Sequence, residues 1–157
     1  MARTFVDPEP KWFEDFAHGD VMITRGRTVD IGDITVFAGL TGDHYQLHTD
    51  AAFMAGNRFG QRIAHGPLTF SLAVGLIGLS GFYGDAIAAL IEITGLKATK
   101  PVFAGDTLHV VATVTVHDAS GPKYGTLGVV YSVRNQSDEE VMTFLQTMLA
   151  KRRQGEN

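Results

Sequence analysis

The chain has 157 residues, of which 45% are hydrophobic and 19% charged, which fits one folded domain with a buried core and excludes a disordered chain. Its net charge of −4 lacks the basic footprint of a nucleic-acid-binding protein, so we expect no nucleic-acid partner. The sequence has no cysteine, which excludes disulfides and thiolate chemistry, and its first twenty residues hold no apolar signal core, so we expect a cytoplasmic protein.

The N-terminal part is predicted to form one strand and two short helices around a polar loop. Residues 20–29 are typical of a strand, and Asp30 is a candidate helix N-cap. Apolar residues then follow at helical spacing, namely Ile31, Ile34, Phe37 and Ala38. A loop over 39–49 carries most of the unusual polar residues. Asp50 is predicted to cap a short helix over 51–55.

The longest apolar segment, 66–79, is predicted to be a buried helix. It is shorter than the ~20 residues needed to span a bilayer, and Thr69 and Ser71 interrupt it, so we expect no membrane partner. Pro67 suits a first helical position because the missing N–H has no partner there in any case. The helix over 67–80 is apolar on nearly every side, which predicts that protein surrounds it.

Four later segments are predicted to be strands: 90–97, 108–117, 124–134 and 141–151. Turn residues separate the last three, at Ser120-Gly121-Pro122 and over 135–139. Consecutive strands joined by short turns indicate an antiparallel sheet. The predicted fold class is therefore α+β, a single domain over 1–157 with its core at about 16–150, in which the sheet wraps a central apolar helix. The outer face of such a sheet needs cover, so we expect a homodimer or higher even oligomer.

Two polar clusters are candidates for chemistry. Asp43 and His48 lie in the polar loop, and a carboxylate and an imidazole that touch one water can pass protons in opposite directions, as hydration of a conjugated carbonyl requires. His65 and Gly66 stand at the start of the apolar helix, where free N–H groups favour negative charge and an amide can stabilise an enolate oxygen. The alternatives are structural: a turn-capping aspartate, a structural histidine, and an ordinary loop-to-helix junction.

Three segments of the sequence resemble the MaoC-like dehydratase family, which includes the (R)-specific enoyl-CoA hydratases and has the hot-dog fold. They are residues 37–50, 62–68 and 100–108. The resemblance covers roughly 16–149 and implies a hot-dog domain with its active site at a dimer interface. It implies that Asp43 and His48 hold and activate a water, and that the Gly66 amide polarises a thioester carbonyl.

The sequence departs from the family pattern at two places near these residues. Tyr45-Gln46 replaces the usual Asn-Pro between the catalytic pair. Val74 stands where some members carry a serine in the central helix, and Ser71 lies one turn earlier. We expect Tyr45, His65, Ser71 and Val74 to contact the substrate.

The predicted function is that of a hydro-lyase, an enoyl-CoA hydratase or 3-hydroxyacyl thioester dehydratase. It would add or remove water across the C2=C3 bond of an acyl-CoA or acyl-carrier thioester. No cofactor is expected beyond the coenzyme A of the substrate, and no metal. A hot-dog thioesterase and a non-catalytic subunit of a hetero-dimeric dehydratase are the alternatives.

The remaining charged residues and histidines are assigned to the surface or the framework. His44 is expected at the surface, and His109 and His117 are expected to be structural or solvent-facing. Residues 151–153, Lys-Arg-Arg, are predicted to form a solvated tail. Arg58, Arg62 and Lys100 lie in loops near the expected mouth of the site, where they are candidates to contact substrate phosphates.

Overall fold

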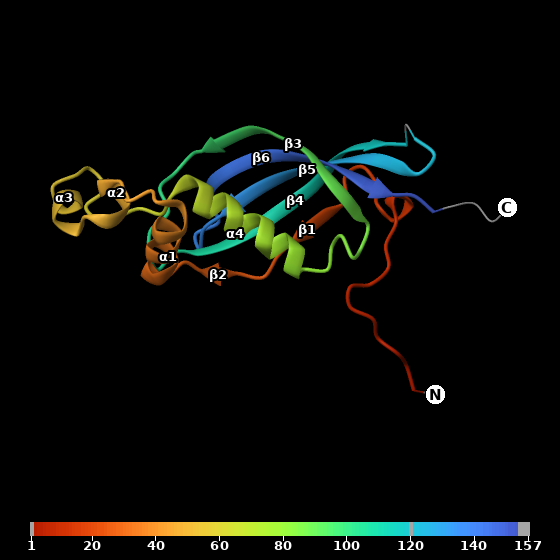
Figure 1. Cartoon of the computed structure of the whole chain (residues 1–157), viewed down its shortest axis with the longest axis horizontal. Coiled ribbons are helices and arrows are strands. Elements are labelled where there is room, and N and C mark those ends of the chain that lie inside the picture. The colour runs from red at the N-terminus through yellow and green to blue at the C-terminus, as the bar shows by residue number, and fades with distance from the viewer. Residues whose placement is uncertain (1, 120, 154–157) are drawn as a thin grey trace.

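The structure is a computed structural model that describes residues 2–119 and 121–153. Its strands pair antiparallel in the order β1-β4-β5-β6-β3, with β2 paired to β4, and the sheet curves around helix α4 (Gly66–Leu79), as Figure 1 shows. The strands are β1 (Val21–Ile23), β2 (Arg27–Thr28), β3 (Ile87–Ala98), β4 (Thr107–Asp118), β5 (Tyr124–Arg134) and β6 (Glu140–Lys151). The predicted α+β fold, an antiparallel sheet wrapped around a central helix, is confirmed.

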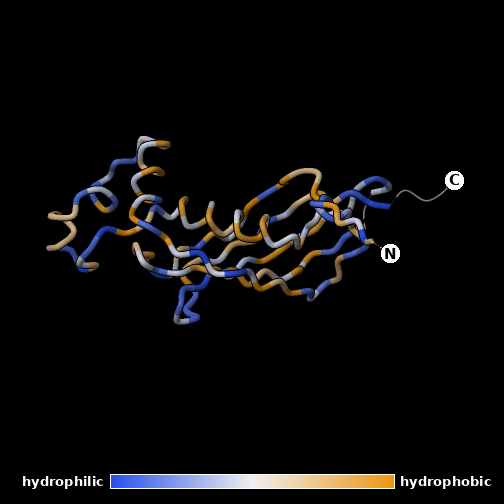
Figure 2. Tube along the Cα trace, turned by 90° about the horizontal axis from the view of Figure 1, so that it is seen from below, coloured by the Kyte–Doolittle hydropathy of each residue, from blue (hydrophilic) through white to orange (hydrophobic). Residues whose placement is uncertain are grey.

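The core lies between α4 and the concave face of the sheet. Side chains of β6 alternate between this face and the outside, and Phe144 and Met148 are buried against the helix side. Helix α4 contributes Ala73, Leu76 and Ile77 to the same core. The hydropathy trace in Figure 2 shows hydrophobic segments along the helix and strands, and hydrophilic ones mainly in the connecting loops.

One side of α4 stays open in the single chain. Ser71 is exposed and Leu79 is 75% exposed, whereas Leu68, Ala73 and Ile77 are buried on the sheet side. The cover that the sequence predicts around the helix comes from this chain on one side only, because one curved sheet covers only one side of a helix. Among residues 2–119 and 121–153, none of the helices is both long and apolar enough to cross a membrane.

The polar loop is more ordered than expected. Helix α1 (Ile31–Thr41) begins at the predicted cap, where the Asp30 carboxylate accepts a bond from the Gly32 N–H, and it continues to Thr41 before Gly42 turns the chain with φ 76°. A short helix α2 (Gln46–Thr49) follows where a loop was predicted. Helix α3 (Ala51–Ala55) is confirmed, with the Asp50 carboxylate accepting from the Phe53 N–H at 2.9 Å.

The strand predictions are correct for β4, β5 and β6 and need correction for the first three strands. Residues 20–29 form two short pieces, since the Thr24 hydroxyl accepts the Val110 N–H that would otherwise continue the ladder. Strand β3 is longer at both ends than the predicted 90–97. Ser120 of one predicted turn lies outside the described residues, and the turn over 135–139 is confirmed by the Asn135 N–H bonding the Glu139 carbonyl.

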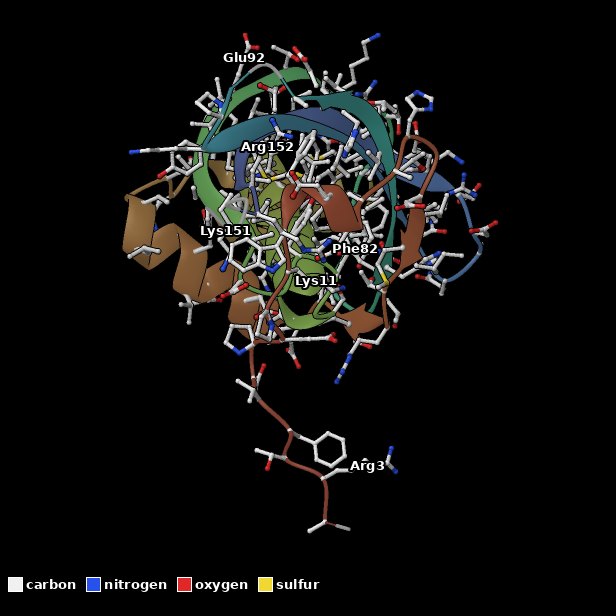
Figure 3. The ribbon with its side chains drawn as sticks, turned by 90° about the vertical axis from the view of Figure 1, so that its right-hand side faces the viewer. Arg3, Lys11, Phe82, Glu92, Lys151 and Arg152 are labelled. Atoms are coloured by element: carbon white, nitrogen blue, oxygen red, sulfur yellow. The ribbon has the colours of Figure 1, made fainter. Side chains whose placement is uncertain are left out.

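The basic C-terminal segment is tied to the N-terminal segment. The Arg152 guanidinium bonds the Glu14 carboxylate at 2.8 Å, beside the short 3-10 helix η1 (Phe13–Asp15), and Arg153 pairs with Asp15. Lys151 pairs with Asp85 at 2.6 Å. Figure 3 views this end of the molecule, with Lys151 and Arg152 labelled. The prediction of a solvated tail is wrong, because partners distant in the sequence neutralise these charges.

Candidate active site

Asp43, His48 and His65 meet beyond the end of the sheet, where α1, α2 and α4 converge. The left-handed turn at Gly42 places Asp43 directly after α1, His48 lies in α2, and His65 is the N-cap of α4. One polar atom from each of the three side chains lies within 4.8 Å of the other two. The chain therefore curls enough between Asp43 and His48 to bring the predicted pair together.

The hydrogen bond of His48 fixes the tautomer of its neutral ring. Its Nδ1 lies 2.8 Å from the Ile63 carbonyl oxygen, and a carbonyl can only accept, so Nδ1 is the donor. The Nε2 of the neutral ring is then an acceptor. The Asp43 carboxylate, which lies within 4.8 Å of a ring nitrogen of His48, is exposed and accepts the Tyr45 N–H at 3.3 Å. A basic ring nitrogen and a carboxylate are thus both available to one water molecule.

His65 contacts both members of this pair. Its side chain is only 1% exposed, and its Nε2–H donates to the Asp43 carbonyl oxygen at 3.0 Å. Its ring stacks on that of His48, with centroids 3.7 Å apart and an interplanar angle of 23°. Its buried Nδ1 has no hydrogen-bond partner among the described residues. His65 was predicted to contact substrate, but its burial assigns it to positioning Asp43 and His48.

A cavity of about 290 Å³ borders His48 and the start of α4. His48 and Gly66 line it, together with Arg58 and Lys100. A β-carbon built on Gly66 would meet no atom within 4 Å, so this position faces open space. The first N–H groups of a helix have no partner inside the helix, and the macrodipole makes this end positive. The cavity can therefore accept an oxygen that gains negative charge.

The other predicted contact residues lie elsewhere. Val74 lines a second cavity, towards the far end of α4. Ser71 is exposed and its hydroxyl donates to the Pro67 carbonyl. Tyr45 is 64% exposed and lines neither of the cavities that border His48. The structure therefore brings Asp43, His48, His65 and Gly66 together, and leaves Val74, Ser71 and Tyr45 outside this group.

The other histidines predicted from the sequence lie outside the Asp43–His48 cluster. His44 is exposed as predicted, and it lines a small cavity with Arg62 on the other side of His48. His117 stacks on Phe13 with centroids 3.9 Å apart, which confirms a structural role. His109 lies 3.5 Å from the Asp138 carboxylate and is a quarter exposed. None of these histidines belongs to the Asp43–His48 cluster.

Three polar side chains that line the second cavity were not predicted from the sequence. Tyr83, Tyr131 and Gln146 all line it. Gln146 carried a visible signal, because it is the polar member of an otherwise apolar alternating row in β6, with Phe144 and Met148 on either side. The two tyrosines carried none, since aromatic residues are ordinary in strands and helix ends.

The residue types of the cluster also occur in metal sites, so their geometry matters. Metal ligands point their lone pairs at one common point. The stacked rings of His48 and His65 instead hold their nitrogen lone pairs in nearly parallel planes, and one nitrogen of each ring is bonded to a carbonyl. The absence of a metal requirement remains a prediction, which full activity of EDTA-treated protein would support.

A single helix held in a curved antiparallel sheet defines a hot-dog protein. A Mycobacterium tuberculosis protein described as a double hot-dog fold superposes on it with a TM-score of 0.79 at 19% identity, a likeness of fold alone. The chain belongs to the MaoC-like dehydratase family, whose domain profile, "MaoC like domain", matches residues 15–134.

Related sequences include both characterised and uncharacterised proteins. Protein MaoC of Klebsiella aerogenes is 36% identical over 69% of this chain, which spans only 32% of that protein. The uncharacterised protein YdeM of Bacillus subtilis is 32% identical over 88% of this chain and 98% of its own length. The (R)-specific enoyl-CoA hydratase of Aeromonas caviae is 34% identical over 45% of this chain and 66% of its own.

Solved structures give the same family. A structure described as a monoamine oxidase regulatory protein from Archaeoglobus fulgius has a TM-score of 0.86 and 33% identity, covering 92% of this chain and 96% of that one. The (R)-hydratase from A. caviae has a TM-score of 0.72 and 26% identity, covering 86% and 97%. Relatives with this fold therefore include proteins described as hydratases and one described as a regulator.

Proposed function

We propose that the protein is a hydro-lyase that adds or removes water across the C2=C3 bond of a 2-enoyl thioester, with coenzyme A as the thiol. The observation that carries this proposal is the convergence of Asp43 and His48. A polar atom of each side chain lies within 4.8 Å of the other, and His48 lines a cavity together with Gly66, the first residue of α4. This constellation supplies two proton-handling groups and an N–H donor next to one space, the parts expected for proton chemistry beside a carbonyl.

The proposed chemistry follows from the hydrogen-bonding state of each group. A water bound between the His48 Nε2 and the Asp43 carboxylate donates to both, so its oxygen lone pair faces the substrate. Its hydroxyl adds to C3, and a proton returns to C2 through the same pair. The electrons of the double bond pass to the thioester oxygen in the transition state, where the Gly66 N–H stabilises the enolate. Dehydration runs the same steps in reverse.

A spectrophotometric assay tests this proposal. The purified protein is incubated with a panel of 2-enoyl-CoA thioesters of increasing chain length, and loss of the conjugated absorbance is followed. Hydration consumes the double bond and releases no thiol, whereas a thioesterase would release free coenzyme A, which a thiol reagent detects. Absence of turnover across the whole panel, with the folded protein present alone, would favour the non-catalytic alternative instead.

The choice of coenzyme A rests on two cations of the first cavity. Arg58 and Lys100 both line it and both are exposed, and Lys100 is also paired to Glu139. Guanidinium and ammonium groups are the usual partners of phosphates. They would meet the nucleotide phosphates of a thioester whose carbonyl lies at Gly66.

Thioesters that lack the nucleotide distinguish the phosphate contact of Arg58 from the hydration step. Arg58→Ala should raise KM for an enoyl-CoA by about tenfold, the loss of one charge-assisted hydrogen bond, with kcat little changed. The same variant should leave KM unchanged for an enoyl N-acetylcysteamine thioester, which has no phosphates. Arg27→Ala removes an arginine that pairs with Asp33, away from the cavity, and serves as the matched control.

A further inference from the structure

The second cavity lies at the opposite end of α4 from the Asp43–His48 pair. It has a volume of about 260 Å³, and its walls include Val74 and Gly78 of α4 and Ile87, the first residue of β3. The first cavity is bordered by Gly66, the first residue of α4, and by Ala98, the last residue of β3. Both cavities therefore border the same two elements, one at each end, as the antiparallel course of α4 and β3 in Figure 1 shows.

The separation between the two cavities suits an acyl chain. Val74 is two turns along α4 from Gly66, which corresponds to roughly 12 Å at the helical rise. A thioester held with its carbonyl at Gly66 would direct its acyl chain along α4 towards Val74. The far end of a chain of medium length would then reach the second cavity.

One wall of this cavity carries a buried acceptor without a donor. The Gln146 side chain is 8% exposed, and its Oε1 has no hydrogen-bond partner among the described residues. It stands in the helix-facing row of β6, where its neighbours Phe144 and Met148 are apolar. Leaving a buried polar atom unpaired destabilises the folded protein, so such an atom calls for a reason such as a ligand.

Two tyrosines that line the same cavity carry a donor without an acceptor. The hydroxyls of Tyr83 and Tyr131 lie 2.8 Å apart and share one hydrogen bond. Burial raises the pKa of Tyr131 to about 12, and burial followed by the neighbouring Tyr131 raises that of Tyr83, so both keep their protons at neutral pH. Two protons and one mutual bond leave one hydroxyl proton free, since no other acceptor bonds it within the described chain.

The charged residues that line the second cavity limit the kind of ligand that it can bind. Asp85 is the charged residue that lines the cavity, and its carboxylate is paired with Lys151 at 2.6 Å. No arginine or lysine lines the cavity within the described residues, so it offers a carboxylate ligand no counter-ion. A hydroxyl both accepts and donates, and it would satisfy a tyrosine proton and the Gln146 Oε1 together.

We propose that this cavity binds a hydroxyl group at the far end of the acyl chain, so that the preferred substrates are ω-hydroxylated 2-enoyl thioesters. The inference rests on the proposed function for the position of the thioester. The polar atoms of Gln146, Tyr83 and Tyr131 themselves call for an uncharged partner that donates and accepts.

Calorimetry with saturated acyl-CoA ligands tests the cavity independently of turnover. Wild-type protein is titrated with a series of acyl-CoA thioesters and with their ω-hydroxy and ω-carboxy counterparts of equal length. At the chain length that reaches the cavity, the ω-hydroxy ligand should bind at least about tenfold more tightly than the plain one, because it satisfies two groups otherwise left unpaired. The ω-carboxy ligand should bind more weakly than the ω-hydroxy ligand.

Variants assign this preference to the cavity. Gln146→Leu and Tyr83→Phe should each abolish most of it, and Gln146→Leu should not lower Tm, since it removes an unpaired buried acceptor. Thr147→Val is the matched control, because the neighbouring side chain of β6 points to the other face of the sheet. Equal binding of plain and ω-hydroxy ligands at every length, or a preference that survives Gln146→Leu, would overturn the inference.

The enoyl-CoA assay keeps the two proposals apart. Hydration of plain enoyl-CoA without an ω-hydroxy preference in calorimetry would refute the inference and leave the proposed function standing. An ω-hydroxy preference in calorimetry without turnover of any enoyl thioester would refute the proposed function and support the cavity as a binding site.

Discussion

At the scale of single residues, the proposed chemistry depends on the side chains of Asp43 and His48. Asp43→Asn removes a negative charge and keeps the shape, and His48→Ala removes the Nε2 acceptor. Each should lower kcat by at least about 10²-fold, the usual contribution of a general acid–base group. Tm should change little for Asp43→Asn, because the Asp43 side chain is exposed. Turnover within a few-fold of wild type in either variant would exclude that residue from the reaction.

His65 should act on the rate through its neighbours. His65→Ala removes the donor to the Asp43 carbonyl and the ring that stacks on His48, so we expect kcat to fall by up to about 10²-fold with KM nearly unchanged. His65→Gln can present an amide N–H near the position of Nε2 and should recover part of the loss. A parallel rise in KM would instead indicate direct contact with substrate.

Gly66 offers a steric test of the oxyanion position. A backbone N–H cannot be removed by an ordinary substitution, but a branched side chain can occupy the space in front of it. Gly66→Val should keep Tm close to wild type, since a β-carbon there meets no atom within 4 Å, and should abolish most turnover by blocking the thioester. Gly75→Val, on an exposed part of the same helix with the same open surroundings, controls for the effect of valine on α4. Unchanged kcat and KM in Gly66→Val would place the substrate elsewhere.

At the scale of elements, the sequence predicts what depends on local periodicity. The alternation in 108–117, 124–134 and 141–151 is sufficient for β4, β5 and β6, and the Asp30 and Asp50 caps locate the starts of α1 and α3. The break between β1 and β2 could not be predicted, because the Thr24 hydroxyl bonds the Val110 N–H, and that pairing joins residues far apart in the chain. Elements specified by their own sequence are predictable, and those shaped by distant partners are not.

In the candidate site too, residues in distinctive local segments were predictable, and features that depend on distant contacts were not. Asp43, His48 and Gly66 were predictable because they stand in short, unusual segments. The burial of His65 beneath them was not, since it depends on how three helices meet. The second cavity was missed because its polar groups come from β5, β6 and the segment after α4, which only the folded sheet brings together.

The link between η1 and the end of β6 should make stability depend on pH. Burial acts to raise the pKa of Glu14, but the hydrogen bonds from Arg152 and Arg153 outweigh it, and the pKa falls from 4.5 to about 2. A carboxyl with a depressed pKa stabilises the fold above its unfolded pKa, and this stabilisation is lost as pH falls through the folded pKa. The contribution of Glu14 is therefore present at pH 7 and disappears between about pH 4.5 and 2.

Glu14→Gln measures this contribution. The variant should lose up to about 1 kcal/mol of unfolding free energy at pH 7, a value kept small because the pair is about 30% exposed. The difference from wild type should shrink as pH is lowered from 4.5 towards 2. Chemical denaturation at several pH values gives the measurement, and Glu9→Gln in the exposed N-terminal segment is the control. A difference that does not depend on pH would show that the charge of Glu14 is not responsible.

At the scale of the whole molecule, the sheet ends in an open edge. Strand β3 lies at the end of the strand order and offers twelve residues of backbone, with Leu90 53%, Ile91 51% and Leu96 47% exposed. An exposed edge strand with apolar side chains is a template for pairing with another strand. The open side of α4 adds further uncovered apolar surface at Leu79. Both features favour assembly with a second copy of the chain, as the sequence analysis expected.

The native mass in solution should therefore be an even multiple of 17.0 kDa. A symmetric pair would bring the same edge of both copies together, because a two-fold interface uses one surface patch twice. Ile91→Glu would place two new carboxylates near each other in such a pair, next to the existing Glu92, and should shift the mass measured by light scattering towards that of the monomer. Val36→Glu puts the same charge on α1, at a residue 70% exposed, and should leave the mass unchanged. If the β3 edge also completes the active site, turnover of the Ile91→Glu variant should fall together with its mass as the protein concentration is lowered. A wild-type monomer that hydrates enoyl thioesters at full rate would contradict the predicted assembly and the predicted link between assembly and turnover. The exposed apolar residues of β3 would then have no function in assembly.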